Sequence, residues 1–375
     1  MVEWKTIGDV TEILDSRRKP VSKDKRCGGI YPYYGANGIQ DYVDDYLFDG
    51  EYILLGEDGS VINDDKSPIL HWATGKIWVN NHAHVLQEKD GYILRYIYYA
   101  LQCVDVSGIV RGTPPKINQA NLRNILIPVP LLTEQNRIVG ILDTFTASIE
   151  NLKQQIEQRK KQYEHYRDQL LDLEGKLGIE MIPIQNLGSF YGGLTGKSKK
   201  DFENGNAKFI TYMNVFSNPS LDISTVGNVF INDGEKQNKV QKGDILFSGS
   251  SETADEAGMS CVVTDDLYED YYLNSFCFGL RLNNPMNYNL HFLKHLLRSR
   301  RIRNAISRTA NGVTRYNISK ARFGKVVIPI PSLEKQNYIV EKLDIFIILI
   351  DSLQQQLEQR QKQFEYYRNK LLTFE

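Results

Sequence analysis

The chain has 375 residues, of which 41% are hydrophobic and 11% aromatic, so it has ample material for a buried core and disorder is not expected. At roughly 150 residues per domain, the length favours two globular domains with additional chain. Lys and Arg total 45 against 46 Asp and Glu, a net charge of −1 that excludes a uniformly basic or acidic chain.

Cysteine usage and the N-terminus indicate the compartment. Cys27, Cys103, Cys261 and Cys277 lie far apart without a CxxC pair, so neither a disulfide framework nor a thiolate zinc site is predicted. The opening MVEWKTIGDV is charged where a signal peptide is apolar, and no stretch reaches the ~18 apolar residues of a membrane span. We therefore expect a soluble, cytoplasmic protein in a reducing compartment.

Residues 1–126 read as an α+β globule. Glu51–Gly56 and Lys76–Val79 look like short strands between Gly, Asn and Asp turns, and Tyr92–Leu101 looks helical. The segment 127–175 differs. Pro128 and Pro130 require an extended entry, after which a helix of about 40 residues, or about 60 Å, is predicted.

The helix carries apolar and aromatic residues at alternating steps of four and three. They are Ile138, Leu142, Phe145, Ile149, Leu152, Ile156, Tyr163, Tyr166, Leu170 and Leu173. This 3.5-residue spacing is typical of a coiled-coil seam. Gly175 and Gly178 are expected to end the helix as C′ glycines do.

Residues 176–327 predict a second α+β globule, with strands at Gly227–Ile231 and Gly243–Phe247 and a helix at Leu290–Ser307. Its similarity to the first globule is faint. Both open with an apolar-Gly turn, Ile7-Gly8-Asp9 and Leu187-Gly188-Ser189.

The segment 328–375 repeats the one that begins at residue 127, without a gap and with about half of the aligned positions identical. Its seam is Ile339, Leu343, Phe346, Ile350, Leu353, Leu357, Phe364, Tyr367, Leu371 and Phe374. Each seam is interrupted once, by Arg159 and Arg360. Two interpretations of these arginines stay open: they fix the register of helix pairing, or they extend to water.

An antiparallel pairing of the two helices would return Glu375 to the first globule and give an approximate two-fold axis with two unlike heads. Such a scaffold suits an asymmetric two-part target. Duplex DNA with two unlike half-sites is one, because half-site spacing mirrors protein geometry in dimeric DNA-binding proteins.

The repeated IP-x-P segment is followed by Gln135-Asn136-Arg137-Ile138-Val139 and Gln336-Asn337-Tyr338-Ile339-Val340, then by Leu-Asp and a Gln-rich coiled coil. With the opening Glu3-Trp4-Lys5 and the run Gly112–Asn118, this order resembles the specificity subunit of type I restriction-modification enzymes. The resemblance implies target-recognition domains at 1–126 and 176–327 and spacer helices at 127–175 and 328–375.

The same resemblance implies a non-catalytic subunit that binds duplex DNA. It implies that two methyltransferase subunits dock on the helices and that restriction (translocase-nuclease) subunits join them. S-adenosylmethionine, ATP and Mg would belong to those partners, with no cofactor or metal in this chain. The subunit interface would use Ile138, Leu142, Phe145, Ile149, Leu152, Ile156, Ile339, Leu343, Phe346, Ile350, Leu353 and Leu357.

No motif supports catalysis. Gly192–Ser198 resembles a phosphate-binding loop, but Tyr191 stands where the first glycine is needed and neither a strand before it nor a metal ligand after it is evident, so a basic loop near DNA phosphates is favoured. His291 and His295 are four apart without the glutamate of a zinc motif. His82 and His84 are interpreted as structural, with base contact as the alternative.

The DNA-contact candidates are basic clusters and polar turns, because Arg pairs with guanine, Asn with adenine and Lys with phosphate. One cluster contains Arg298, Arg300, Arg301, Arg303 and Arg308. The selected candidates are Arg17, Arg18, Lys19, Asn37, Ser60, Arg111, Lys116, Lys197, Lys199, Lys200, Ser250, Arg308, Asn311, Thr314 and Arg315. The alternative hypothesis is a coiled-coil scaffold that binds only proteins.

Overall fold

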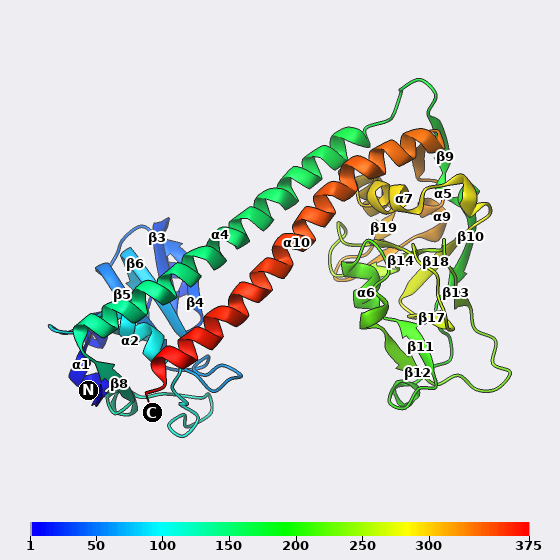
Figure 1. Cartoon of the computed structure of the whole chain (residues 1–375). Helices are drawn as coiled ribbons and strands as arrows, with labels where there is room; N and C mark the ends of the chain where they lie inside the picture. The colour runs from blue at the N-terminus through cyan, green and yellow to red at the C-terminus, as the bar shows by residue number, and fades with distance from the viewer. Residues whose placement is uncertain (1, 375) are drawn as a thin grey trace. The chain divides into compact units, whose positions relative to one another are not determined.

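The computed structural model describes residues 2–374 and divides into two compact units. Unit 1 contains the residues up to Lys153 and those from Gln355 onward, and unit 2 is Gln154–Gln354. Two long helices, α4 (Leu132–Leu170) and α10 (Leu333–Leu372), belong partly to each unit (Figure 1). Each unit therefore combines one α+β head with the beginning of one long helix and the end of the other.

Unit 1 is built on a six-stranded sheet in the order β2-β7-β5-β6-β3-β4, antiparallel except between β3 and β6. The strands are β2 (Thr11–Ile13), β3 (Gly28–Gly35), β4 (Gly38–Val43), β5 (Phe48–Gly56), β6 (Leu70–Val79) and β7 (Ala83–Glu88). Unit 1 also contains the antiparallel pair β1 (Val2–Thr6) and β8 (Leu126–Pro130), with helices α1 (Ile7–Val10), α2 (Leu94–Leu101) and α3 (Gln119–Arg123). The run Tyr52–Leu55 of β5 is buried throughout, as the centre of a covered sheet requires.

Unit 2 contains three small sheets and a two-stranded pair. Their strands, in sheet order, are β10 (Gly188–Gly192), β18 (Cys277–Leu282), β14 (Ile245–Ser248) and β16 (Ser260–Val262); β12 (Gly227–Val229), β11 (Ala207–Ile210), β17 (Tyr271–Leu273) and β13 (Lys239–Val240); β15 (Ser250–Ser251), β20 (Tyr316–Ile318) and β19 (Ala310–Asn311); and β21 (Val327–Ile330) with β9 (Glu180–Pro183). The helices are α5 (Ile184–Leu187), α6 (Tyr212–Ser217), α7 (Leu290–Leu297), α8 (Arg300–Ser307) and α9 (Lys320–Phe323).

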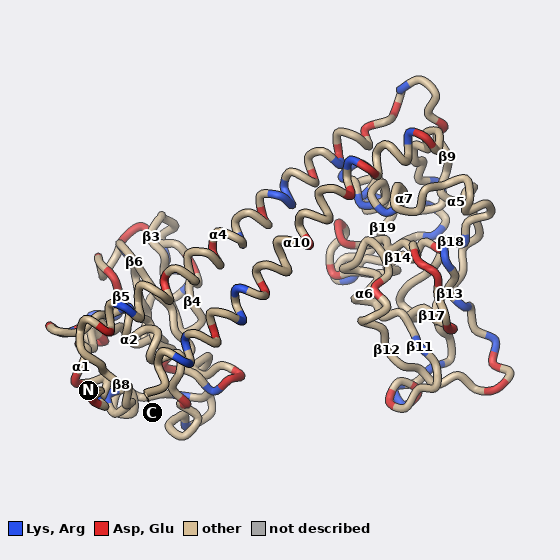
Figure 2. The backbone as a smooth tube through the Cα atoms, in the orientation of Figure 1, with Lys and Arg blue, Asp and Glu red and all other residues tan. Residues whose placement is uncertain are grey.

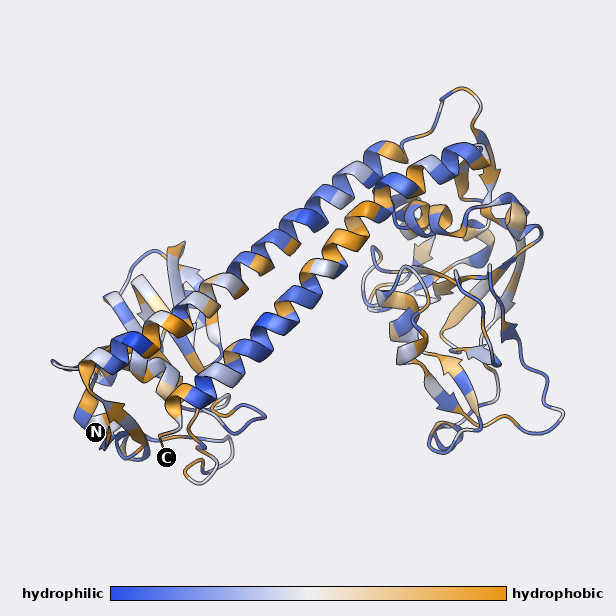
Figure 3. Ribbon diagram, viewed as in Figure 1, coloured by the Kyte–Doolittle hydropathy of each residue, from blue (hydrophilic) through white to orange (hydrophobic). Residues whose placement is uncertain are grey.

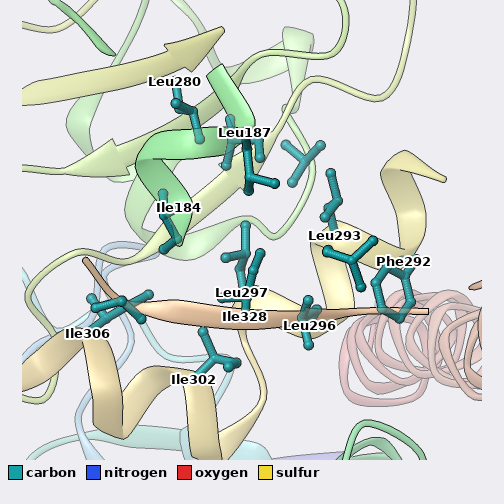
Figure 4. Close-up of a cluster of buried hydrophobic side chains, with 14 of the residues drawn as sticks. Ile184, Leu187, Leu280, Phe292, Leu293, Leu296, Leu297, Ile302, Ile306 and Ile328 are labelled. Carbon is teal, nitrogen blue, oxygen red and sulfur yellow. The ribbon is translucent and has the colours of Figure 1, made fainter. Parts of the chain in front are cut away.

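Apolar residues from several helices and strands form the largest core of unit 2. In Figure 4, α7 and α8 turn their leucines, isoleucines and Phe292 toward Ile184 and Leu187 of α5, Leu280 of β18 and Ile328 of β21. The sequence predicted one helix over Leu290–Ser307. The prediction of one continuous helix was wrong, because α7 ends at Leu297 and a second helix, α8, begins at Arg300.

The two heads share a backbone repeat that the sequence barely shows. The amide of Ile7 donates to Ile125 O (2.8 Å), and that of Ile184 donates to Val326 O (2.9 Å), at equivalent places between the first strand pair and the first sheet. From there β2-β7-β5 in unit 1 corresponds to β10-β18-β14 in unit 2. The equivalent of Ile7 is thus Ile184, and the proposed match of Ile7-Gly8 with Leu187-Gly188 was out of register.

Antiparallel pairing of the long helices is confirmed inside each unit. Phe145 stacks on Tyr367 in unit 1, and Tyr166 stacks on Phe346 in unit 2, both with ring centroids 5.3 Å apart. Phe145 and Phe346 are repeat equivalents, as are Tyr166 and Tyr367, so the same contact is made twice. Figure 3 shows hydrophobic and hydrophilic residues mixed along both helices, as one apolar seam requires.

The ends of each seam pack into a head rather than only against the other helix. Ile138 and Leu142 are fully buried in the core of unit 1 together with Leu372, and Phe374 packs beside them. Ile339 and Leu343 occupy the equivalent core of unit 2. The second helix therefore ends at the first head, as predicted, while Glu375 itself lies outside the described residues.

Other expectations for the helices were partly wrong. Helix α4 ends at Leu170, before the predicted glycines, because Leu171 and Leu173 turn into the core of unit 2. The two seam arginines also differ. Arg360 lies 5.6 Å over the Phe145 ring, whereas Arg159 is exposed and donates to Gln162 on its own helix. Within residues 2–374, no helix combines the length and the apolar content needed to cross a bilayer.

Candidate nucleic-acid interface

Each head brings together two loops that lie far apart in its sequence. In unit 2 the segment after β14 pairs with β20, with Ser250 opposite Asn317 and Ser251 opposite Tyr316. In unit 1 the segment after β5 makes the same antiparallel bridge between Asp58 and Lys116. We call these two pairings the ladders of the heads. They stand in the same register, since Ile117 N donates to Glu57 O and Ile318 N to Gly249 O, both at 2.9 Å.

The ladder of unit 1 ends in a tight hairpin. Arg111 and Lys116 exchange backbone hydrogen bonds of 3.0 and 2.8 Å, and Gly59 N donates to Pro115 O at 2.9 Å. Gly112, with φ 86°, makes the turn that a residue with a Cβ would strain to adopt. The Asn118 side chain then caps α3 by accepting from Asn121 N (2.8 Å). These bonds give the Gly112–Asn118 run a defined conformation next to the exposed Arg111.

A network of charged side chains contacts this ladder and stabilises it. Glu57 accepts from Arg18 at 2.6 Å and pairs with Lys116 at 3.0 Å, while Asp15 pairs with His84 at 2.6 Å. Burial opposes the charged form of both carboxyls. The bonds from Arg18 and Lys116 to Glu57, and from His84 to Asp15, outweigh it and lower both pKa values.

The second nitrogen of buried His84 donates to Ile117 O at 2.8 Å. The carboxylate of Asp15 and the carbonyl of Ile117 therefore engage both ring nitrogens of His84. Asp15, Glu57 and His84 offer ligand atoms within 4.8 Å of one another, the spacing of a metal site. Protein groups already engage all three side chains, because Asp15 and Ile117 O contact the His84 ring and Arg18 and Lys116 pair with the carboxylates.

The network reassigns two predicted DNA contacts in unit 1. The Arg18 side chain is only 11% exposed and also donates to Ala83 O (2.7 Å), so it supports the ladder, as does His84. Lys116 points its ammonium at Glu57. Arg17 lies over the Phe48 ring at 4.7 Å. The remaining candidates are accessible; Lys19, Asn37 and Arg111 are exposed and Ser60 is partly exposed.

In unit 2, residues of the ladder line one side of a pocket of about 490 Å³. It is lined by Tyr212, Met213, Phe216, Ser250, Ser251, Glu252, Glu256, Thr314 and Arg315. Tyr212 stacks on Phe216 and its hydroxyl donates to Ser250 O at 2.7 Å. Arg315 donates to Ser250 Oγ (3.3 Å) and lies 5.3 Å over the ring of Phe276. The predicted candidates Ser250, Thr314 and Arg315 thus share one site.

Other candidates of unit 2 lie apart from the pocket or are engaged. The Lys197 side chain is 5% exposed and bonds Glu235 at 2.6 Å, which with the Asn232 amide lowers the pKa of Glu235 to about 2. Lys199 and Lys200 are exposed on the 3-10 turn Lys199–Phe202, and Arg308 is exposed. Asn311, exposed at the end of β19, accepts from Arg322.

The resemblance of Gly192–Ser198 to a phosphate loop does not extend to structure. The strand that precedes it, β10, contains no buried residue, whereas a phosphate loop follows a buried strand. In addition, Lys197 is bonded to Glu235, and Ser198 caps a single 3-10 turn instead of opening an α-helix. The geometry therefore lacks the helix N-terminus that would hold a phosphate.

The prediction that the arginine cluster of unit 2 contacts DNA was wrong for two of its members, Arg298 and Arg303. Arg298 bonds Ser260 O (2.6 Å) and also reaches the carbonyls of Val215, Phe216 and Asn218. Arg303 donates to the carbonyls of Asp255, Ala257 and Gly258. Burial lowers the pKa of each to about 10. Figure 2 accordingly shows basic and acidic residues interspersed in both units.

Helix α7 holds its histidines for structure. His295 is buried, donates to Asp344 (2.9 Å) and accepts from the Tyr163 hydroxyl (2.8 Å). His291 is exposed beside Lys294. These bonds tie the head of unit 2 to both long helices.

One repeated glutamine has a role that was not predicted from the sequence. Gln135 and Gln336 are 2% and 1% exposed, and each donates to the carbonyl of the preceding proline segment, Pro130 O or Pro331 O, at 2.9 Å. The side-chain oxygen of each glutamine also accepts a hydrogen bond from the backbone amide of the residue that precedes a helix of the head. Ile93 N, before α2, donates to Gln135 at 3.2 Å, and Asn289 N, before α7, donates to Gln336 at 2.8 Å. Their identity in both copies was the available signal.

Known proteins share this architecture. A family model described as type I restriction modification DNA specificity domain matches residues 1–159 and 177–360. A chain of Haemophilus influenzae named as a type I restriction enzyme specificity subunit is 34% identical, covering 100% of this chain and 96% of its own. The specificity subunit of the Escherichia coli EcoR124I and EcoR124II enzymes is 27% identical, with 100% and 94% covered.

Among solved structures, the S subunit of a type I restriction-modification system from M. genitalium matches with a TM-score of 0.60 at 16% identity, covering 100% of this chain and 97% of its own. That likeness shows the shared fold. With the family model matched over most of both units, the ladders belong to a chain built to confer DNA specificity. This protein is a member of the type I restriction-modification DNA specificity family.

Proposed function

We propose that this chain recognises a bipartite, asymmetric duplex DNA target, with one half-site bound by each head, and that it does so as the non-catalytic subunit of a type I restriction-modification enzyme. The observation that carries the proposal is the pair of ladders. The same backbone register is built in both heads and filled with unrelated side chains, Asp58 opposite Lys116 in one and Ser250 opposite Asn317 in the other. One scaffold with two sets of contacts suits two unlike half-sites.

Partners supply the chemistry in this proposal. Two methyltransferase subunits dock on α4 and α10, and restriction subunits join them. S-adenosylmethionine, ATP and Mg bind those partners and not this chain. The relatives support this arrangement, since they are named as subunits of restriction enzymes. The repeated helix supports a pair of equivalent docking sites, because each long helix offers the same ungapped sequence pattern.

The long helices set the distance between half-sites in this proposal, since each one runs from residues of one unit to residues of the other. Removing one heptad from each, residues 152–158 and 353–359, keeps the seam register and shortens each helix by about 10 Å. The preferred gap should shrink by about three base pairs at 3.4 Å per pair. The measurement is selection from duplexes with randomised gaps, and an unchanged gap contradicts this role of the helices.

DNA binding itself is tested by titrating duplex DNA with the full chain and its methyltransferase subunits at several salt concentrations. Sequence-specific affinity that falls with salt is expected, because phosphate contacts release counterions. Mapping methylated adenines in cells with and without the chain would then identify the target. Protein binding without any salt-dependent DNA affinity would favour a protein-only scaffold instead.

A further inference from the structure

The pocket of unit 2 holds opposite charges that do not neutralise each other. Arg315 and the glutamates Glu252 and Glu256 line the same 490 Å³ space. Over residues 2–374, no ion pair joins Arg315 to either carboxylate; its side chain instead contacts Ser250 Oγ and the ring of Phe276. A carboxylate and a guanidinium that face one pocket without pairing leave room for a ligand that presents both an acceptor and a donor.

The two glutamates have different roles. One oxygen of Glu256 accepts from Thr253 Oγ1 at 2.8 Å and from Ser251 Oγ at 3.2 Å, so Glu256 fixes the turn that follows β15. Glu252 is exposed, and the described part of the chain gives it no partner. Glu252 is therefore the acceptor that is available to a ligand.

The guanidinium of Arg315 is held in a defined plane. It lies over the ring of Phe276, which is 57% exposed, and its Nε is tied to Ser250, which leaves its terminal nitrogens free. A planar fork with two free N–H groups matches the N7 and O6 acceptors of guanine. The ladder of unit 1 differs, because Asp58 pairs with His82 and Lys116 with Glu57.

A carboxylate at a DNA surface is repelled by phosphates, so it is tolerated where it accepts from a base amino group. In the major groove a G·C pair places guanine N7 and O6 beside the cytosine N4 amino group. We infer that Arg315 and Glu252 together recognise one G·C base pair, with the guanidinium on guanine and the carboxylate on cytosine. The inference rests on the proposed function and assigns specificity residues to the second head.

The experiment is selection from a random duplex library by the full chain in complex with its methyltransferase subunits. Glu252→Gln removes the charge that rejects carbonyl edges, and Arg315→Lys keeps the charge but loses the bidentate fork. Both variants should relax the preference at one and the same G·C pair by about 5- to 140-fold, the range for one base contact. The other half-site should stay unchanged.

Lys200→Ala is the matched control. This lysine is exposed in the same unit outside the pocket, so its loss should weaken binding to all sequences alike. The inference is overturned if the two variants keep the wild-type preferences, if they relax different positions, or if neither wild-type half-site contains a G·C pair. A wild-type complex without any sequence preference would instead refute the proposed function.

Discussion

Replacing Gln135 with alanine should destabilise unit 1 strongly without touching the ladder. The side chain is 2% exposed and joins Pro130 O to Ile93 N, so the change leaves one buried acceptor and one buried donor without partners. Each orphaned group costs about 1 to 3 kcal/mol, which gives a loss of about 2 to 6 kcal/mol. With a urea m-value of about 2 kcal/mol/M, the unfolding midpoint should fall by about 1 to 3 M.

Tryptophan fluorescence gives an assay that is specific to this unit. The three tryptophans, Trp4, Trp72 and Trp78, all belong to unit 1. Gln336→Ala makes the same change in unit 2 and should move the fluorescence transition less than Gln135→Ala does. Asn136→Ala is the control, because its exposed amide donates only to Leu132 O of the same helix, and it should change stability by less than about 0.5 kcal/mol. If Gln135→Ala unfolds with the midpoint of the control, the bonds of Gln135 to Pro130 O and Ile93 N do not hold the head on the helix.

Three further predictions concern unit 2. Arg298→Ala should lower the stability of unit 2 by about 3 kcal/mol or more, because several buried carbonyls lose their donor. Arg308→Ala, at an exposed position, should leave the stability unchanged. Thermal melts followed by circular dichroism compare the two variants. Burial opposes ionisation of Asp344, but bonds from His295 and Lys294 lower its pKa to about 2, so the stability it contributes above about pH 4 should vanish as pH falls through 2. Asp344→Asn should show a flatter acid dependence over that window, and an identical profile would refute the role of this carboxylate. Lys197→Ala should return the pKa of Glu235 from about 2 toward its usual value, as measured by NMR titration of the side chain, with no change in nucleotide binding.

Local patterns in the amino-acid sequence were enough to predict the long helices and their duplication. A 3.5-residue seam and paired prolines are local patterns, and an ungapped repeat fixes which positions are equivalent. Once the structure pairs Phe145 with Tyr367, the equivalent pairing of Phe346 with Tyr166 follows from the repeat. The family resemblance rested on the same segments. The seam spacing, the prolines and the repeat can be read from the sequence because each depends only on residues that are near one another along the chain or on a direct comparison of two segments.

Tertiary structure alone decided which polar residues are available for binding. Arg298 and Arg315 look alike in the sequence, yet one is buried under backbone carbonyls and the other borders a pocket. The register of the heads, in which Ile7 matches Ile184, and the meeting of Asp58 with Lys116 and of Ser250 with Asn317, depend on strand pairing between distant segments. Burial and pairing are set by the whole packed head, so no local pattern could reveal them.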